Sequence, residues 1–193
     1  MYRNTFLSVM FLACCFNGSL CAQSDAQIYE RTCDAKTYPF SDPSPVATPN
    51  NSYYPYFRFD GFSMQAQEKQ WKMVVLENDY VKLTVTPEIG GKIWGAIDKV
   101  NNKEFVYTNG VVKFRDVAMR GPWTSGGIEF NFGIIGHAPT CSTPIDYLTK
   151  KNVDGSVSCH IFSYEWITRT VWNVEINLPK DKAYFTTHKI GRA

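Results

Sequence analysis

The sequence lacks long runs of charge and long apolar segments. Its 20 basic and 18 acidic residues give a formal net charge of +2 over 193 residues, and the basic residues are scattered along the chain. Nucleic-acid-binding proteins gather lysine and arginine on one face, so no nucleic-acid partner is expected. No segment reaches the roughly 20 consecutive apolar residues that a membrane-spanning helix needs, so no transmembrane segment is expected.

The sequence also lacks the spacing of a metal site or a phosphate-binding loop. His137, Cys141 and His160 are the candidate metal ligands, but the close, regular intervals of a zinc site are missing. The paired glycines are not followed by a Lys-Ser/Thr pair at a strand-to-helix junction, as those of a phosphate-binding loop are. The sequence therefore predicts no metal site and no cofactor.

Residues 1–22 have the layout of a secretory signal peptide. Arg3 lies in a short polar start, an apolar run follows over residues 5–16, and the segment closes on Cys21 and Ala22. Processing after Ala22 would leave an exported protein, which is periplasmic, attached to the cell surface or secreted.

Removal of this segment would take three of the six cysteines with it. A lipoprotein signal is the alternative and would place lipid on Cys14 or Cys21, but neither follows the expected order of aliphatic and small residues. The cysteines that remain are Cys33, Cys141 and Cys159. Because three is odd, at most one disulfide can form, and both a Cys141–Cys159 bond and free buried thiols stay open.

Residues 23–62 form a segment rich in proline and aromatic residues, which we expect to be extended. Five prolines between Thr37 and Phe62 remove backbone donors and fix φ, so a helix is excluded there. The run from Tyr53 to Phe59 is too aromatic to stay in water and is expected to lie across a sheet face. The domain itself is expected over residues 63–193.

Alternating apolar and polar residues predict antiparallel strands along that domain. Residues 73–77 and 80–86 are expected to form a hairpin around Asn78-Asp79. Pro87 should end this pair, and further strands are predicted over residues 92–98 and 104–107.

Two later strands are predicted over residues 157–168 and 170–178, each with one packed face. The first places four ring side chains on one side, namely His160, Phe162, Tyr164 and Trp166. The second places four apolar side chains on one side, namely Trp172, Val174, Ile176 and Leu178.

The predicted fold class is all-β, an antiparallel β-sandwich in preference to a barrel, because no long stretch shows a 3.6-residue period. A last strand begins over Ala183–Thr187 and is expected to stop in Lys189–Ala193. An unpaired strand is a hazard at a sheet edge. We therefore interpret the chain as a truncated or frameshifted piece of a longer protein, with a naturally short protein as the alternative.

The segment from Arg120 to His137 concentrates glycines, aromatic rings and polar side chains between strand-like blocks, where loops carry function. An aromatic ring can stack on the C–H face of a sugar, and polar side chains can bind its hydroxyl groups. The expected ligand-binding residues are Arg120, Trp123, Glu129, Asn131 and His137.

Glu129 and His137 are also the candidate catalytic residues, because both can exchange a proton near neutral pH when their surroundings shift the pKa. Glycoside hydrolysis would need a second carboxylate, for which Glu88 and Asp146 are the candidates. In the structural alternative, Glu129 pairs with Arg120, His137 is a rim residue and the aromatic side chains fill the core.

Five stretches follow one another in order between Thr37 and Thr187: TYPFSDP at 37–43, YPYFRFDG at 54–61, LENDY at 76–80, PEIGGKIW at 87–94 and the block from Arg120 to His137. Together they resemble the DUF5107 family of exported bacterial proteins. The resemblance implies the galactose mutarotase-like supersandwich, of which this chain would hold the N-terminal portion. It also implies association with the TPR repeats that lie downstream in longer relatives.

The stretches at 78–80 and 87–91 are similar to the opening of aldose 1-epimerases, where they are scaffold. Those enzymes use a mid-chain histidine as general acid and a glutamate far toward the C-terminus as general base. His137 could stand for the first, and the second would lie beyond Ala193.

Three functions remain open from the sequence. The favoured one is an exported, carbohydrate-binding, mutarotase-like domain that is catalytically incomplete as given. The second is aldose 1-epimerase or glycoside hydrolase activity in the intact parent, through Glu129 and His137. The third is a non-catalytic structural or protein-interaction module with its aromatic side chains buried.

Overall fold

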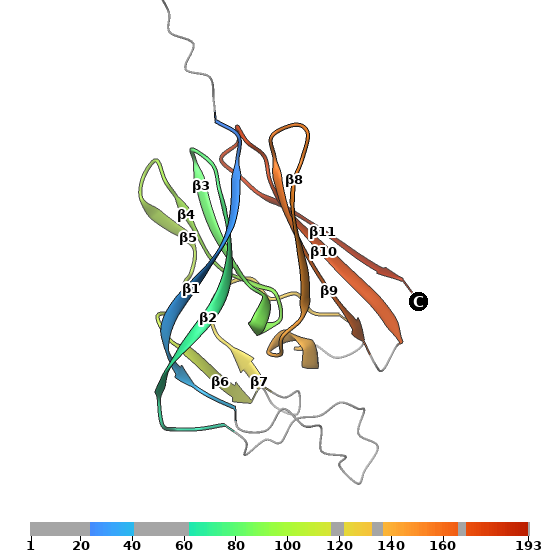
Figure 1. The fold of residues 1–193 in the computed structure, drawn as a ribbon. Coiled ribbons are helices and arrows are strands. Elements are labelled where there is room, and N and C mark those ends of the chain that lie inside the picture. Colours follow the sequence, from blue (N-terminus) through green and yellow to red (C-terminus); the bar gives the residue numbers. More distant parts are fainter. Residues whose placement is uncertain (1–23, 41–61, 117–121, 133–136, 166–168, 193) are drawn as a thin grey trace, which may run out of the picture.

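The computed structural model describes residues 24–40, 62–116, 122–132, 137–165 and 169–192. These residues form two packed β-sheets and two short 3-10 helices (Figure 1), which confirms the predicted all-β sandwich. No helix of this described part is long and apolar enough to cross a membrane.

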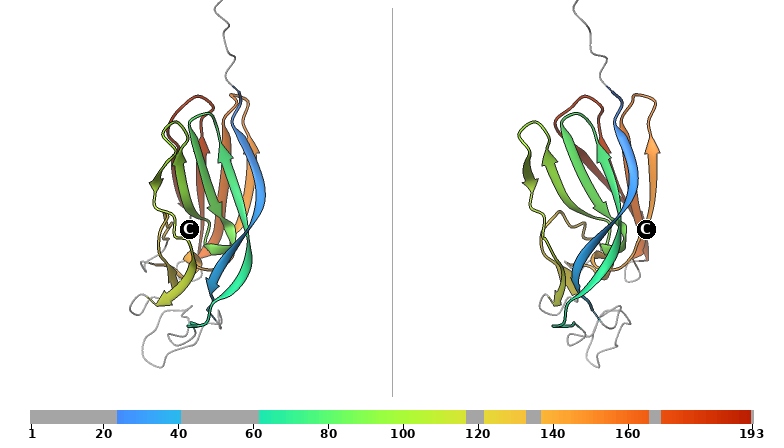
Figure 2. Two further views of the ribbon diagram at one scale, coloured as in Figure 1. Left: turned by 90° about the vertical axis from the view of Figure 1, so that its left-hand side faces the viewer. Right: turned by 60° about the vertical axis from the view of Figure 1, so that its left-hand side comes forward.

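The larger sheet has seven strands in the order β5-β4-β3-β2-β1-β6-β7. All neighbours are antiparallel except β1 and β6, which pair in parallel at Thr37 and Val112. The sheet curls strongly, as the views in Figure 2 show. Its strands are β1 (Gln27–Tyr38), β2 (Gln67–Glu77), β3 (Val81–Thr86), β4 (Lys92–Asp98), β5 (Lys103–Val106), β6 (Val112–Asp116) and β7 (Pro122–Thr124).

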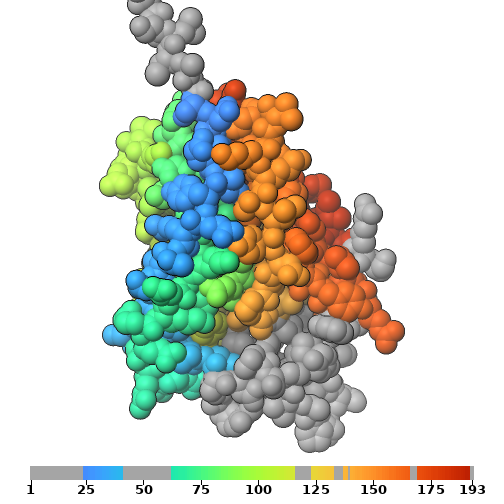
Figure 3. Space-filling view, in the orientation of Figure 1, coloured from blue at the N-terminus to red at the C-terminus, as the bar shows by residue number. Residues whose placement is uncertain are grey.

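The smaller sheet is antiparallel and has four strands in the order β11-β10-β9-β8. They are β8 (Asp146–Lys151), β9 (Val157–Glu165), β10 (Thr170–Leu178) and β11 (Thr186–Arg192). The 3-10 helices are η1 (Pro87–Ile89), between β3 and β4, and η2 (Pro139–Cys141), before β8. Figure 3 shows β1 lying against the smaller sheet, where Tyr147 of β8 donates a hydrogen bond to Glu30 at 2.7 Å.

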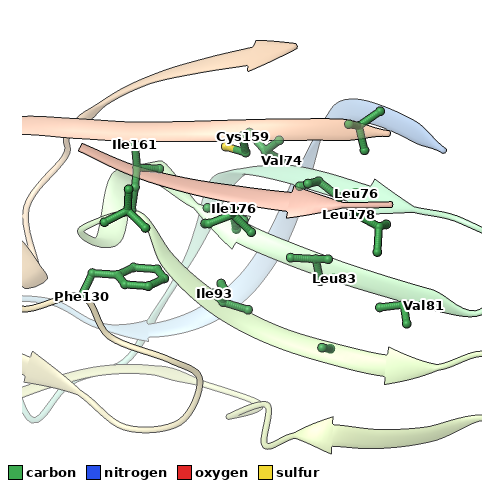
Figure 4. Packing of buried hydrophobic residues seen from close by; sticks show 14 of the residues in the cluster. Val74, Leu76, Val81, Leu83, Ile93, Phe130, Cys159, Ile161, Ile176 and Leu178 are labelled. Atoms are coloured by element: carbon green, nitrogen blue, oxygen red, sulfur yellow. The ribbon is translucent and has the colours of Figure 1, made fainter. Parts of the chain in front are cut away.

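The main core lies between the two sheets (Figure 4). Alternation along β3 and β10 turns every second side chain inward, as predicted, and the polar residues between them face outward. The inward-facing residues include Val74, Leu76, Leu83, Ile161, Trp172, Val174, Ile176 and Leu178, each 1% exposed or less.

The packed face predicted for β9 was wrong. Val157, Cys159 and Ile161 are buried, whereas Phe162 is half-buried and Tyr164 is exposed. Both faces of this strand carry apolar residues, so its own sequence does not decide between them. The register does, because Cys159 and Ile161 lie opposite Ile176 and Val174, the buried residues of β10. Trp166 lies outside the described residues.

A second, smaller core fills the inside of the curl, on the face of the larger sheet that points away from the sandwich. It consists of Trp71, Met73, Ile89, Trp94, Val112 and Phe114. The indole nitrogen of Trp71 donates to the Thr37 hydroxyl at 2.9 Å, so its one polar group is satisfied.

The ends of the domain differ from the expectation. Residues 27–38, within the segment expected to be an extended leader, form β1 and pair with β2 along its whole length. The aromatic run from Tyr53 to Phe59 and the signal segment 1–22 lie outside the described residues. The last strand ends at Arg192, within the expected range, but it is not unpaired, because β11 pairs with β10 along its whole length.

The three cysteines that the sequence left open are free thiols. Cys33 is half-buried, and Cys141 and Cys159 are buried.

Candidate functional site

Two glycines bring the predicted site against the beginning of β4. Gly126 and Gly127 have φ values of 80° and 67°, and the carbonyl oxygen of Ile93 lies where a Cβ of Gly127 would be. Ile128 then forms an isolated antiparallel bridge with Ile93, through hydrogen bonds of 2.8 and 3.1 Å. The two segments are antiparallel. Glu129, which follows Ile128, therefore lies on the same side of the bridge as Lys92, which precedes Ile93.

Glu129 lies at the centre of the site, with only 12% of its side chain exposed. Its Oε1 accepts a hydrogen bond from Asn131 Nδ2 at 2.8 Å and lies 2.7 Å from His137 Nδ1. Its Oε2 is buried and has no hydrogen-bond partner among the described residues. A buried carboxylate oxygen without a donor is costly, so Oε2 is an unsatisfied acceptor in the described part of the site.

Asn131 holds the cluster together rather than facing outward. Its Oδ1 accepts the backbone N–H of Ala138 at 2.9 Å and the Cys141 thiol at 3.1 Å, while its amide nitrogen donates to Glu129. These contacts tie the Glu129 carboxylate to η2. Asn131 therefore acts on the site by positioning Glu129.

His137 is held in an unusual backbone conformation, with φ at 55°. Such left-handed geometry costs a non-glycine residue of order 1 kcal/mol and is enriched at functional sites. The ring meets that of Trp123 edge to face, with centroids 6.1 Å apart. The side chain is 30% exposed, so it is the part of the Glu129–His137 pair that reaches solvent.

Lys92 is a member of the site that the sequence analysis missed. It is 1% exposed and donates to the hydroxyl of Thr124 at 3.0 Å and to the carbonyl oxygen of the same residue. Burial lowers the pKa of its ammonium group, and the Glu129 carboxylate opposes that change. The feature of the sequence that could have identified Lys92 is its position at the start of an apolar run, Lys-Ile-Trp-Gly-Ala-Ile.

Cys141 completes the cluster as a neutral thiol. Burial, followed by the negative charge of Glu129, raises its pKa well above the usual range. A thiol held in its protonated form is a weak nucleophile, so Cys141 contributes packing and a hydrogen bond rather than reactivity. We call Lys92, Trp123, Glu129, Asn131, His137 and Cys141 the Glu129 cluster.

The other predicted site residues lie elsewhere. Arg120 is outside the described residues. Glu88 accepts the backbone N–H of Lys72, and Asp146 is exposed on β8, opposite Phe162. His160 lies on β9 beside Asn173 and Glu175, so it is not gathered with His137.

Comparison with known proteins supplies a family. The model of the domain of unknown function DUF5107 matches residues 48–191. The chain belongs to the DUF5107 family. This confirms the resemblance seen in the sequence, while the wider likeness to galactose mutarotases stays a prediction.

The DUF5107 chain is also similar to a solved structure, that of a TPR-domain containing protein from Parabacteroides distasonis. The two share 26% sequence identity and superpose with a TM-score of 0.77. The match covers 88% of this chain and 29% of the other, so the present chain spans less than a third of that protein.

Proposed function

We propose that this DUF5107 domain binds a neutral carbohydrate at the Glu129 cluster. The observation that supports the proposal is the buried Oε2 of Glu129, which has no donor among the described residues. A sugar hydroxyl is a neutral donor of the right kind, and hydrogen bonds to charged groups contribute about 1.5–3 kcal/mol. The buried ammonium of Lys92 offsets the carboxylate charge, so the ligand need not bring a cation.

The half-buried ring of Trp123 supports the same ligand class. It packs edge to face on His137 beside the carboxylate, so an apolar surface and a hydrogen-bond acceptor adjoin each other. A sugar ring presents C–H patches on one side and hydroxyl groups around its edge. Hence Trp123, Glu129 and His137 are proposed to contact the ligand, and Asn131 to position Glu129.

The experiment is a thermal-shift screen of the chain against neutral monosaccharides and oligosaccharides, followed by calorimetric titration. A ligand that binds only the native state raises the melting temperature in proportion to its occupancy. Glu129→Gln should weaken binding about tenfold or more, since it removes the charged acceptor. Glu68→Gln, on the exposed part of β2, is the matched control and should bind the sugar as tightly as the unsubstituted chain does. If no sugar binds the folded protein, or if both variants bind equally well, the proposal fails.

An enzymatic function in the intact parent is the second proposal, and the 2.7 Å contact between Glu129 and His137 favours it. A carboxylate that orients a partly exposed imidazole is a common arrangement for proton transfer. We propose epimerase chemistry ahead of glycoside hydrolysis, because Glu88 is engaged by the backbone N–H of Lys72 and Asp146 is exposed on β8, and no contact joins either carboxylate to the described residues of the cluster. The intact parent should accelerate the mutarotation of a sugar above its spontaneous rate, as measured by polarimetry, and Glu129→Gln should lose that acceleration. Unchanged mutarotation in that variant would refute this second proposal.

A non-catalytic interaction module is the third proposal. The similar solved protein is named as TPR-domain containing, so we propose that the domain associates with such repeats in longer relatives. We also propose that the chain is exported. Mass spectrometry of the protein from a secreting host should then find Gln23 as its first residue, and an intact N-terminus would contradict export.

A further inference from the structure

The curled sheet lines an open cavity of about 370 Å³ on the face opposite the sandwich core. None of its lining residues belongs to the Glu129 cluster. Cavities of about 300–1,000 Å³ are typical of small-molecule sites. We call this space the curl cavity; β1 to β5 and the segment 108–112 line it.

The floor of the curl cavity is apolar. Met73, Trp94 and Val112 close its bottom, and they are 4%, 6% and 1% exposed because they belong to the second core. Gly95 adds no side chain to the floor, and the Thr108 hydroxyl lies where its Cβ would be. The floor can therefore take the flat or aliphatic body of a small ligand.

The rim carries charges of both signs, with Arg31 and Lys82 on one side of the balance and Asp34 and Glu104 on the other. The Glu104 carboxylate accepts the backbone N–H of Thr108 at 3.4 Å. Arg31 and Cys33 lie on the cavity face of β1, opposite Met73 and Trp71, whereas Asp34 lines the cavity from a position whose side chain alternates to the other face of the sheet. Lys82 lies 3.6 Å from Glu77, whereas no ion pair or hydrogen bond engages the Arg31 guanidinium within the described part of the chain. Arg31 is therefore available to an anion, and it lies directly opposite Met73 of the floor.

We propose that the curl cavity binds a small amphipathic anion, with its apolar body on Met73 and Trp94 and its anionic group on Arg31. A planar guanidinium can bind a carboxylate or sulfonate group through two hydrogen bonds. This site is independent of carbohydrate binding at the Glu129 cluster, because the two share no residue.

The probe is 8-anilinonaphthalene-1-sulfonate, which joins an apolar ring system to one sulfonate and fluoresces when it leaves water. The full chain should bind it saturably at one class of site. Arg31→Gln should weaken binding about tenfold, and Arg169→Gln, an exposed arginine far along the chain, should not. Thr84→Phe places a ring inside the cavity and should abolish binding. Glu129→Gln should leave it unchanged.

Alkylation of Cys33 gives a second readout that does not depend on the filling variant. Cys33 lines the cavity and is half-buried, whereas Cys141 and Cys159 are buried. Reaction with N-ethylmaleimide should slow in proportion to probe occupancy. The proposal is overturned if the probe leaves Cys33 alkylation unchanged and binds Arg31→Gln as tightly as the parent. It is also overturned if binding is lost only in Val171→Ser, on the exposed outer face of β10.

Discussion

Replacing Gly127 by alanine should destabilise the domain far more than the same change at Gly110. Gly127 has a φ of 67°, and the backbone carbonyl of Ile93 fills the position of the missing Cβ. The alanine can be accommodated only if the bridge between Ile93 and Ile128 opens. This bridge places the segment that contains Glu129 beside the start of β4, where Lys92 lies. The substitution therefore tests whether the bridge holds the site together.

The expected magnitude follows from two contributions. A left-handed backbone costs an alanine about 1–2 kcal/mol relative to glycine. Opening the bridge loses two backbone hydrogen bonds, of 2.8 and 3.1 Å, at about 1 kcal/mol each. The free energy of unfolding should therefore fall by about 3–4 kcal/mol. For a domain of this size, that lowers the melting temperature by roughly 10 °C.

Gly110 is the control, because it has no heavy atom within 4 Å of its Cβ position and no left-handed φ. Gly110→Ala should change the free energy of unfolding by less than about 0.5 kcal/mol. Urea unfolding followed by tryptophan fluorescence measures both variants against the parent. Equal stability of Gly127→Ala and Gly110→Ala would refute the role assigned to the bridge.

Three further changes test the buried groups. Lys92→Met should lower the free energy of unfolding by about 3 kcal/mol, because it removes two buried hydrogen bonds to Thr124 and the favourable charge interaction with the Glu129 carboxylate. Lys103→Met on the exposed strand β5 should have little effect, and equal losses in urea unfolding would contradict the role given to Lys92. Trp172→Phe should cost less than about 1 kcal/mol, since the indole N–H has no partner among the described residues, while Trp172→Ala should cost about 3–5 kcal/mol. Similar losses for both, measured by thermal melting, would contradict this. Burial raises the pKa of Cys159 from 9.0 to about 12, so its stabilising effect is complete below pH 9 and is lost as the pH rises toward 12. In the presence of reductant, the free energy of unfolding should fall above pH 9 in both proteins. The fall should be steeper in the unsubstituted chain than in Cys159→Ala, and the two slopes should differ by about 1.4 kcal/mol per pH unit. Identical slopes would show that the thiol ionises freely in the fold.

Strands with one wet face could be predicted from the sequence. From Val81 to Val85 in β3 and from Trp172 to Leu178 in β10, the inward residues are apolar and the outward residues between them are polar, so the period of two determines the strand and its face. The turn at Asn78 was also predictable, because its side-chain oxygen accepts the backbone N–H groups of Tyr80 and Val81.

Strand β1 could not be predicted, because most of its residues are exposed and carry no packed pattern of their own. Its pairing with β2 runs from Gln27 opposite Glu77 to Thr37 opposite Gln67, so the partner strand specifies it. The prediction of the inward face of β9 was wrong for a related reason. Apolar residues lie on both faces of this strand, so the register with β10 determines which face is buried.

The core of the candidate site was predictable because its members are close in the chain. Trp123, Glu129, Asn131 and His137 lie within one segment and do meet in space. Lys92 lies 37 positions before Glu129 in the printed numbering, and only the fold brings it there. The engagement of Asn131 by Ala138 and Cys141 likewise depends on η2, which the sequence did not indicate.

The free Oε2 of Glu129 is proposed to accept a ligand hydroxyl, and calorimetric titration with deoxy sugars measures that contact. The best sugar from the screen and its series of single deoxy analogues would be titrated into the parent and into Glu129→Gln. One analogue should bind the unsubstituted chain at least tenfold more weakly than the sugar itself does, and this difference should shrink in Glu129→Gln. If every analogue loses the same factor in both proteins, no ligand hydroxyl reaches Glu129, and the proposed sugar site at this residue is refuted.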